Sequence, residues 1–580
     1  MDPIVVRRRQ PATYGDWPLD LHPLVARVYA ARGLAAHEAA PARLTDLVAP
    51  SALGGIPEAC DLLADAITDG RRICIVGDFD ADGATGTAVA VRGLRLLGAR
   101  DVCYRVPNRM LDGYGLSVGL VDSLADIRPD LIVTVDNGIA SHAGVAAARD
   151  RGMRVIVTDH HLPGATLPSA DAIVNPLLER AAGTREARGL LGHLAGVGVM
   201  FYLLLALRAR LFPGDGAARP DLASLLDLVA LGTVADLVPL DANNRILVSA
   251  GLHRIRTGRA SAGIAALYRV AGRDTWRAVA ADLGYALGPR INAAGRLEDM
   301  GLGIECLLCD DRAAALTLAE RLSTINAERR ELQAAMVEQA EVMLACFADR
   351  YRDDALPCGI VLHEPDWHQG VVGLVASKLK ERLNRPVVAF ACADEGGVEL
   401  RGSARSVAGF HLRDALAEID ALHPGLIGRF GGHAMAAGLS LSAVNLATFA
   451  AEFDAVARRR IDPAQFERCL WSDGELGVDE FSADNARALR YAAPWGQAFP
   501  EPAFDNVFAV ESWRAVGEKH LRMQLRPEQG GDTVEAILFD AGDAMPPPAR
   551  VRALFQLDLN DWNGRERLQL LVRHIEPAAY

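Results

Sequence analysis

The sequence predicts an α/β protein in which a parallel-sheet domain and a smaller α/β domain are joined by a long helix and followed by an all-β domain. Between residues 71 and 175, short apolar runs alternate with segments of helical length, which is typical of a parallel sheet with crossover helices. Residues 304–356 contain neither glycine nor proline and favour one long helix. Residues 465–580 instead carry short strand-like runs separated by turns.

Five segments follow from these patterns. A chain of 580 residues is too long for a single hydrophobic core, so several domains are expected. The last segment has about five strands, and a small barrel of the OB type fits that number. We expect an N-terminal segment at 1–50, the parallel-sheet domain at 51–303, the connecting helix at 304–356, the second α/β domain at 357–460 and the OB-like domain at 465–580.

Composition and charge narrow the class of protein. Nine cysteines without a paired framework, and no apolar leader among the first residues, predict a cytoplasmic protein without disulfides. The longest uncharged stretch, residues 189–207, has too short a dense apolar part for a membrane span and predicts a buried helix. A net charge of −13 argues against non-specific wrapping of nucleic acid. A local basic channel, or carboxylates neutralised by metal ions, would still be compatible with an acidic total.

The densest chemical signal is the run GDFDADGAT, in which Asp78, Asp80 and Asp82 follow an apolar strand and precede a helix. Carboxylates this close repel one another unless cations hold them. A solvated acidic loop is the alternative. The glycines in the run favour a site, because they let the backbone approach a ligand at the turn from strand to helix.

Further candidate ligands follow other apolar runs. LIVTVDNG ends in Asp136, VIVT is followed by Asp159, His160 and His161, and Asp236 lies in LGTVADLVPL. Ligands of open α/β sheets bind beyond the carboxyl ends of the strands, so these side chains are expected to meet there. Carboxylates with imidazoles predict Mn²⁺ as the preferred ion and Mg²⁺ as the alternative.

Four of these runs, GDFDADG, VDNG, TDHH and GTVADLVPL, resemble in the same order the N-terminal motifs of the DHH phosphoesterase superfamily, which is named after the triplet Asp159, His160 and His161. The resemblance implies hydrolysis of a phosphate ester at two divalent cations. Two such cations can clamp a phosphoryl oxygen and activate water, so no protein nucleophile is needed.

The resemblance also implies a role for each residue of the cluster. His161 would lie close to the phosphate, and Asp78 would support the cluster or join the coordination. We therefore predict Asp136, His160 and His161 as catalytic residues. The implied metal ligands are Asp80 and Asp236 for one ion, Asp82 and His160 for the other, Asp136 as the bridge between the ions, and Asp78.

Later runs, LGPRINAAGRLEDM, HEPDWHQGVVGLVASKL, RGSARS and GRFGGHAMAAG, resemble the middle segment and the DHHA1-type second domain of the RecJ family. Guanidinium groups and a hydroxyl suit a phosphate, and glycine amides can approach an anion closely. A surface turn is the alternative for the Arg-Ser run taken alone. By resemblance, Arg290, Ser403 and Arg405 would hold a terminal phosphate. The predicted substrate-binding residues are Arg109, Tyr114, Arg290, Asn292, Arg296, Arg401, Ser403, Arg405, Gly431, Gly432 and His433.

Resemblance to the RecJ family implies a metal-dependent exonuclease that is specific for single-stranded DNA. It implies degradation from the 5′ end toward the 3′ end, release of 5′-mononucleotides, and work in DNA recombination and repair. The implied partners are single-stranded DNA, a single-strand-binding protein and a RecQ-type helicase, with a monomeric chain and no membrane. OB folds bind single strands by aromatic stacking and basic grooves. The candidates for that binding are Trp513, Lys519, His520, Arg522, Phe539 and Trp562, of which several are expected to be core.

Two other functions remain open at this point. One is a phosphodiesterase for RNA or short oligonucleotides that uses the same chemistry. The other is a scaffold protein with an inactivated fold of this type, which is disfavoured because every implied metal ligand is present.

Overall fold

The structure, a computed structural model, describes residues 4–10, 17–34, 36–39, 43–108, 114–178, 185–214, 219–350, 357–394, 396–432, 434–461, 468–517, 519–541, 546–562 and 565–578. It describes the backbone alone for residues 36–37, 185–186, 188, 343–350, 468, 561–562 and 565. The chain forms two compact units. The smaller unit comprises Met1–Val5, Arg296–Glu298 and Ser323–Leu470, and the larger unit comprises Val6–Gly295, Asp299–Leu322 and Trp471–Tyr580.

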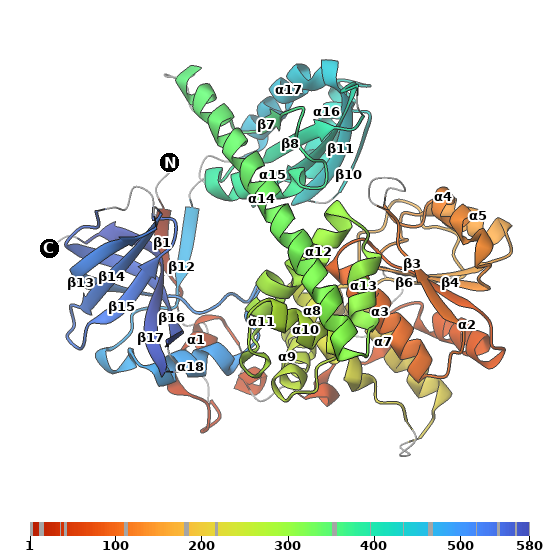
Figure 1. Cartoon of the computed structure of the whole chain (residues 1–580), viewed down its shortest axis with the longest axis horizontal. Helices are drawn as coiled ribbons and strands as arrows, with labels where there is room; N and C mark the ends of the chain where they lie inside the picture. The colour runs from red at the N-terminus through yellow and green to blue at the C-terminus, as the bar shows by residue number, and fades with distance from the viewer. Residues whose placement is uncertain are drawn as a thin grey trace. The chain divides into compact units, whose positions relative to one another are not determined.

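A parallel sheet in the strand order β3-β2-β4-β5-β6 lies in the larger unit (Figure 1). Every residue of β2 and β4 is buried, because helices cover both faces of the sheet. Alternate residues of β2 pack on α2, α3 and α7 on one face and on α4 and α5 on the other. The predicted parallel sheet is thus confirmed. Its strands are β2 (Ile73–Val76), β3 (Val102–Arg105), β4 (Leu131–Val135), β5 (Arg154–Thr158) and β6 (Ala172–Val174), and its helices are α2 (Ile56–Thr68), α3 (Ala81–Leu96), α4 (Val118–Ser123), α5 (His142–Asp150) and α7 (Gly196–Leu211).

The strand order changes direction at β2. From β2 the chain crosses to β3 on one side, and it then returns to place β4 on the other side. Such a switch point leaves a crevice beyond the carboxyl ends of the two strands, where open α/β sheets bind their ligands. The acidic run after β2 and Asp136 after β4 both fall at this crevice.

Helices without strands follow the sheet. The uncharged stretch contributes most of α7, which is largely buried, as predicted. Among the described residues no single helix has the length and apolarity of a membrane span, whereas one bent pair, Leu44–Ala52 with Ile56–Thr68, reaches both by length and composition alone. Between β6 and the long helix, the other α-helices and the π-helix are α6 (Arg185–Leu191), α8 (Leu226–Ala235), α9 (Ala242–Arg256), α10 (Ala262–Val270), α11 (Ala280–Asp282), the π-helix η7 (Leu283–Leu287), α12 (Gly288–Leu297) and α13 (Gly301–Leu308).

The long helix is α14, which spans Arg312–Arg350. It begins later than the predicted segment, because α13 and a short turn occupy residues 301–311. The chain passes from the larger to the smaller unit within α14, after Leu322. The five segment limits proposed from the sequence otherwise remain predictions.

The smaller unit contains a mixed sheet in the order β10-β11-β9-β8-β7. Only the β7 and β8 pair is parallel, and the other neighbours are antiparallel. A core of phenylalanines and aliphatic residues lies between the sheet and α16 and α17. The elements are β7 (Ile360–His363), α15 (Val372–Leu383), β8 (Val387–Cys392), β9 (Glu399–Arg405), α16 (Leu412–Leu422), β10 (Arg429–Gly432), β11 (Ala436–Ser442) and α17 (Leu446–Arg460).

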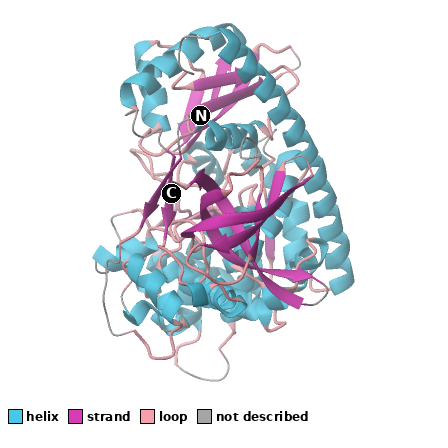
Figure 2. Ribbon diagram, turned by 90° about the vertical axis from the view of Figure 1, so that its left-hand side faces the viewer, coloured by secondary structure: helices cyan, strands magenta, loops and turns pink. Residues whose placement is uncertain are grey.

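The C-terminal strands close into a barrel in the order β13-β14-β15-β17-β16, drawn in dark blue in Figure 1 and in magenta in Figure 2. Closure comes from the antiparallel pairing of β13 with β16, and β15 pairs with β17 in parallel. The predicted all-β domain of five strands with an OB-like barrel is thus confirmed. Its strands are β13 (Phe504–Val516), β14 (His520–Pro527), β15 (Val534–Leu538), β16 (Arg550–Trp562) and β17 (Arg565–Pro577).

The N-terminal segment packs on the residues that precede the barrel. Strand β1 (Ile4–Arg8) pairs with β12 (Arg468–Ser472), and α1 (Pro23–Ala31) contacts α18 (Ala483–Ala492). Arg32 of this segment forms an almost fully buried ion pair with Asp473, at 3.1 Å between Nη2 and Oδ2. Breaking one partner of such a pair leaves an uncompensated buried charge, so the contact fixes the two ends of the chain together.

Candidate active site

The loop after β2 places three carboxylates at the crevice. Asp78 is buried, and Asp80 is the N-cap residue of α3. Its carboxylate accepts hydrogen bonds from the backbone N–H groups of Asp82 and Gly83, at 2.9 and 3.0 Å. Because a capping carboxylate satisfies the free donors of a helix start, the sequence itself fixes this acidic turn.

Asp82 joins α3 to the start of α7. Its two carboxylate oxygens accept hydrogen bonds from the backbone N–H groups of Gly196 and Val197, at 2.6 and 2.9 Å. Burial, followed by the charge of Asp80, raises the pKa of Asp82 to about 7. The protein without cations therefore holds this carboxylate at an energetic cost.

Asp136 lies at the centre of the cluster with a φ of 65°, in the left-handed region that is uncommon for residues other than glycine. Its side chain is 2% exposed, and Oδ1 lies 3.0 Å from Nε2 of His160. Burial, together with the charges of Asp82 and Asp80, raises the pKa of Asp136 well above its ordinary value. A buried, strained and mutually repelling carboxylate is typical of a functional site.

In the triplet after β5, Asp159 has a different role from the two histidines. Asp159 accepts hydrogen bonds from the backbone N–H groups of His160, His161 and Ile139, and its Oδ1 lies 2.7 Å from Nδ1 of His161. Burial opposes ionisation of Asp159, but the hydrogen bonds from His161 outweigh it and hold the pKa of Asp159 below its ordinary value. Asp159 therefore fixes the backbone of both histidines and the ring of His161, a role that the family resemblance did not specify.

Asp236 reaches the cluster from a helix. The apolar run before it forms the end of α8, so Asp236 is the C-cap of a helix and does not follow a strand as the other candidates do. Its Oδ2 lies 3.5 Å from His160 Nε2. Burial, followed by the charge of Asp82, raises the pKa of Asp236 well above its ordinary value.

These side chains fit divalent cations. Ligand atoms of Asp136, His160 and His161 lie within 4.8 Å of one another, and so do those of two further sets, Asp82, His160 and Asp236, and Asp78, Asp80 and Asp136. Asp136 belongs to two of the sets, and its buried Oδ1 accepts no hydrogen bond from the described residues. Oxygen donors with imidazole suit Mn²⁺ and Mg²⁺, and a buried acceptor that lacks a donor is one that a cation can satisfy.

Comparison with known proteins agrees with this geometry. Three family models match: the DHH family, N-terminal domain, at residues 72–233, the DHHA1 domain at 357–459, and the RecJ OB domain at 472–574. The chain is 50% identical over 585 residues to the single-stranded-DNA-specific exonuclease RecJ of Dickeya dadantii (strain 3937), with 100% of both chains covered. The chain belongs to the RecJ family.

Solved structures of RecJ from Thermus thermophilus are similar to nearly the whole chain. The structure in complex with Mn²⁺ has a TM-score of 0.79 and 33% identity, and it covers 97% of this chain and 77% of that one. The structure in complex with Mg²⁺ has a TM-score of 0.70 and 32% identity, and it covers 97% of this chain and 78% of that one.

The larger unit holds three of the substrate residues predicted from the RecJ resemblance. Tyr114 donates a hydrogen bond to the backbone oxygen of Asp136 at 3.1 Å, and its hydroxyl lies 3.2 Å from Nδ1 of His161. Asn292 Oδ1 accepts from the N–H of Ala81 at 2.8 Å, which ties α12 to the acidic turn. The guanidinium of Arg290 donates to the backbone oxygen of Ala286. Arg109 lies outside the described residues.

The remaining predicted substrate residues belong to the smaller unit. Arg296 donates to the backbone oxygen of Gly370 at 3.2 Å. Arg401, Ser403 and Arg405 alternate along β9 and so project from one face of the sheet. The run therefore forms a strand, and the alternative of a surface turn is wrong. Gly431 and Gly432 lie on β10, and His433 lies outside the described residues.

Gly431 on β10 and Gly438 on β11 leave a strip of backbone without side chains beside Ser403, and we call this strip the ledge. Neither Gly438 nor Gly373, which lies next to Ser403, was predicted from the sequence. Gly438 on β11 pairs with Ser403 on one side and with Gly431 on the other. A Cβ atom added at Gly431 or Gly438 would meet nothing within 4 Å, so this part of the sheet face is open. Gly373, at the start of α15, would bring a Cβ to 2.8 Å from Ser403 Oγ and 3.0 Å from Arg405 Nη2. The helix start therefore lies directly against both side chains.

Arg405 is held rigidly on this ledge. Its guanidinium donates to the hydroxyls of Ser377 and Ser403, at 3.1 and 3.0 Å. A fixed planar donor beside a helix start and bare backbone is a suitable environment for an anion such as a phosphate.

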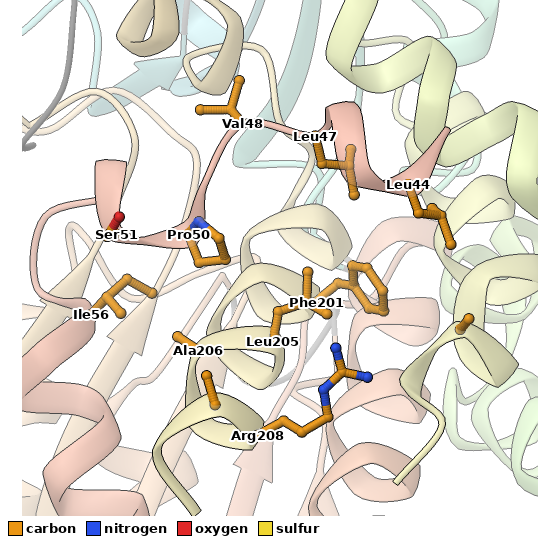
Figure 3. Close-up of a pocket in the computed structure, with 12 residues that line it drawn as sticks. Leu44, Leu47, Val48, Pro50, Ser51, Ile56, Phe201, Leu205, Ala206 and Arg208 are labelled. Atoms are coloured by element: carbon orange, nitrogen blue, oxygen red, sulfur yellow. The ribbon is translucent and has the colours of Figure 1, made fainter. Parts of the chain in front are cut away.

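Two other features lie apart from this chemistry. An apolar cavity of about 540 Å³ between residues 44–56 and α7 contains none of the cluster residues (Figure 3).

On the barrel, Trp513 and Phe539 are exposed, and the ring of His520 packs edge-on against Phe539. They remain candidates for base stacking, whereas the side chain of Trp562 lies outside the described residues.

Proposed function

We propose that this chain is a single-stranded-DNA-specific exonuclease that hydrolyses phosphodiester bonds with two divalent cations, Mn²⁺ or Mg²⁺. We propose further that it degrades strands from the 5′ end, releases 5′-mononucleotides and acts in recombination and repair. Membership of the RecJ family supports the substrate and the reaction. The single observation that carries the chemistry is the convergence of the buried Asp136 Oδ1 with His160 Nε2 and Asp236 Oδ2, with the first two atoms 3.0 Å apart.

The residues of the cluster would have different roles in binding the cations and in positioning the histidines. Asp80 and Asp236 would hold one cation and Asp82 and His160 the other, with Asp136 between them. When bound, the two cations supply charge for the phosphoryl oxygens and activate water. Asp159 positions the histidines, because it bonds to both of their backbone N–H groups. Burial lowers the pKa of His161, but its hydrogen bond to Asp159, together with the charges of Asp159, Asp78 and Asp80, raises that pKa above its ordinary value, so the ring is a candidate proton donor to a phosphoryl oxygen.

The ledge of the smaller unit would hold the terminal phosphate of the strand. Ser403 and Arg405 provide a hydroxyl and a guanidinium on one face of β9, and the bare backbone of Gly431 and Gly438 leaves room for the ligand. Recognition of a terminal phosphate would make the enzyme act from an end and set its direction. Arg290, Asn292 and Tyr114 stay proposed contacts or supports on the metal side.

The proposal is tested with one single-stranded DNA that carries a label at the 5′ or the 3′ end and either a 5′-phosphate or a 5′-hydroxyl. Stepwise release from the 5′ end in Mn²⁺, abolished by EDTA and by Asp136→Ala, is expected. Arg405→Lys keeps the charge but removes the planar fork, so the preference for a 5′-phosphate should fall about 10-fold or more. Arg459→Lys, at an arginine of α17 that pairs with Glu418, is the matched control and should change nothing.

Other outcomes would favour the rival functions. Cleavage of short ribo-oligomers with an intact DNA strand would support an oligonucleotide phosphodiesterase, and no cleavage of either in Mn²⁺ would support a scaffold. The single-strand-binding protein, the RecQ-type helicase, the monomeric state and the cytoplasmic location stay predictions from resemblance and composition.

A further inference from the structure

One buried amide connects two segments of the larger unit that lead to proposed metal ligands. Asn244, in the first turn of α9, has no exposed surface. Its side-chain nitrogen donates hydrogen bonds to the backbone oxygens of His193 and Pro239, at 2.7 and 2.9 Å. Because both partners can only accept, the nitrogen of the amide faces them, and both of its N–H donors are used.

The first segment leads to the groups that hold Asp82. His193 lies shortly before the start of α7, where the backbone N–H groups of Gly196 and Val197 donate to the two carboxylate oxygens of Asp82, at 2.6 and 2.9 Å. A shift of the segment at His193 would therefore shift the donors that fix this carboxylate.

The second segment begins at Asp236. Pro239 lies in the loop that joins Asp236, the C-cap of α8, to α9. Leu237 has a φ of 60°, so the backbone directly after Asp236 adopts a conformation that costs free energy unless its surroundings hold it. The hydrogen bond from Asn244 to Pro239 holds this loop and so contributes to the position of Asp236.

A second link between the same two segments is more exposed. Nδ1 of His193 lies 2.9 Å from Oδ2 of Asp241, the N-cap residue of α9. The side chain of His193 is 47% exposed, so water weakens this contact. The amide of Asn244 is shielded from water, and its hydrogen bonds are stronger for that reason. Asn244 is therefore the main connection between the two segments.

We propose that Asn244 is a positioning residue of the metal centre, which sets the distance between Asp82 and Asp236 through the two backbone segments that it connects. The two carboxylates converge on one histidine, because Oδ2 of Asp82 and Oδ2 of Asp236 lie 3.9 and 3.5 Å from Nε2 of His160. The inference rests on the proposed function, in which Asp82 and Asp236 bind different cations. Their separation then contributes to the spacing of the two cations, which have to act on the same phosphate.

The test compares Asn244→Ala with Asn243→Ala, at the adjacent asparagine. Asn243 is also buried, but its Oδ1 accepts from the N–H of Val48 and the hydroxyl of Tyr202, at 3.1 and 2.8 Å, and neither partner lies in the segments that Asn244 connects. Each variant is measured by its melting temperature, by calorimetric Mn²⁺ binding, by the electron paramagnetic resonance spectrum with Mn²⁺, and by kcat and KM on a single-stranded oligonucleotide. Asn244→Ser, a smaller change, takes the place of Asn244→Ala if the alanine variant does not fold.

Both alanine variants should lose stability, because each leaves buried polar groups unpaired. Only Asn244→Ala is expected to weaken Mn²⁺ binding about 10-fold, to change the magnetic coupling between two Mn²⁺ ions, and to lower kcat about 10²-fold with KM unchanged. A wild-type spectrum and wild-type Mn²⁺ affinity in a folded Asn244 variant, or the same losses in Asn243→Ala, would overturn the inference. A wild-type protein that binds two Mn²⁺ ions but leaves single strands intact would refute the proposed function instead, because the spectra would still test the role of Asn244.

Discussion

Asp136→Asn should stabilise the metal-free protein while it abolishes catalysis. Asn has the size of Asp and tolerates the φ of 65° at this position, so the substitution removes charge with little other change. The pKa of the neighbouring Asp82 rises from 3.8 to about 7. A rise of about 3 pH units corresponds to about 4 kcal/mol for keeping that one carboxylate ionised. Burial and the charges of Asp82 and Asp80 also raise the pKa of Asp136 itself, and the substitution removes the charge on which they act, so we expect a gain of about 2 kcal/mol.

The size of this gain in stability depends on pH. A carboxyl group with a raised pKa in the folded state destabilises the fold as pH rises from the unfolded value, 3.8, to the folded value, about 7 for Asp82, and the penalty is complete above that. The variant should therefore melt a few degrees higher than the wild type at pH 8 in EDTA and at nearly the same temperature at pH 4. Added Mn²⁺ should raise the melting temperature of the wild type more than that of the variant. The exonuclease rate of the variant should fall by about 10³-fold or more.

Asp227→Asn is the matched control for this experiment. Asp227 is also fully buried, but its carboxylate accepts hydrogen bonds from the N–H groups of Leu228 and Ser261, at 3.0 and 2.6 Å. An amide there would turn a donor toward a donor, so this variant should be destabilised at pH 8. A fall in the metal-free melting temperature of Asp136→Asn at pH 8, equal to that of the control, would refute the reasoning about a repelling cluster.

Two further predictions concern the same cluster. Mn²⁺ binding should release more protons at pH 6 than at pH 8, because burial raises the pKa of Asp82 to about 7 and the ligands must be ionised to bind. Calorimetry in buffers of different ionisation enthalpy measures the number of protons released. Equal release at both pH values would contradict the prediction. Gly196→Ala should lower kcat about 10²-fold, since the new Cβ would lie 2.5 Å from the Cβ of Asp136 and displace that carboxylate. Gly198→Ala is its control, because the added Cβ would meet only the flexible side chain of Leu194 at 3.1 Å, and equal losses in both variants would show a general packing defect instead.

The sequence predicted the cluster where local pattern and sheet topology agree. Asp78 and Asp136 closely follow buried strands, and Asp82 lies in the first turn of the helix after β2, so the rule that ligands bind at the carboxyl ends of strands was enough to bring them together. Asp236 fits no such rule, because it ends a helix, and only the resemblance to a family motif identified it. The same distinction holds for the fold: alternating runs predicted the parallel sheet and short strands predicted the barrel, whereas the start of the long helix was placed too early.

The residues that were missed are those whose role depends on a neighbour far away in sequence. Gly196 belongs to no recognisable motif. It matters because its backbone N–H donates to the carboxylate of Asp82, and because a side chain at this position would collide with Asp136. Gly438 matters because β11 places it between Gly431 and Ser403, a register that no run of letters contains. A substitution at such a glycine would leave every recognisable motif intact and still close the ledge or shift a ligand. A variant at Gly196 or Gly438 is therefore expected to lose activity although every motif is intact. Metal affinity distinguishes the two variants, because only Gly196 lies against a proposed metal ligand.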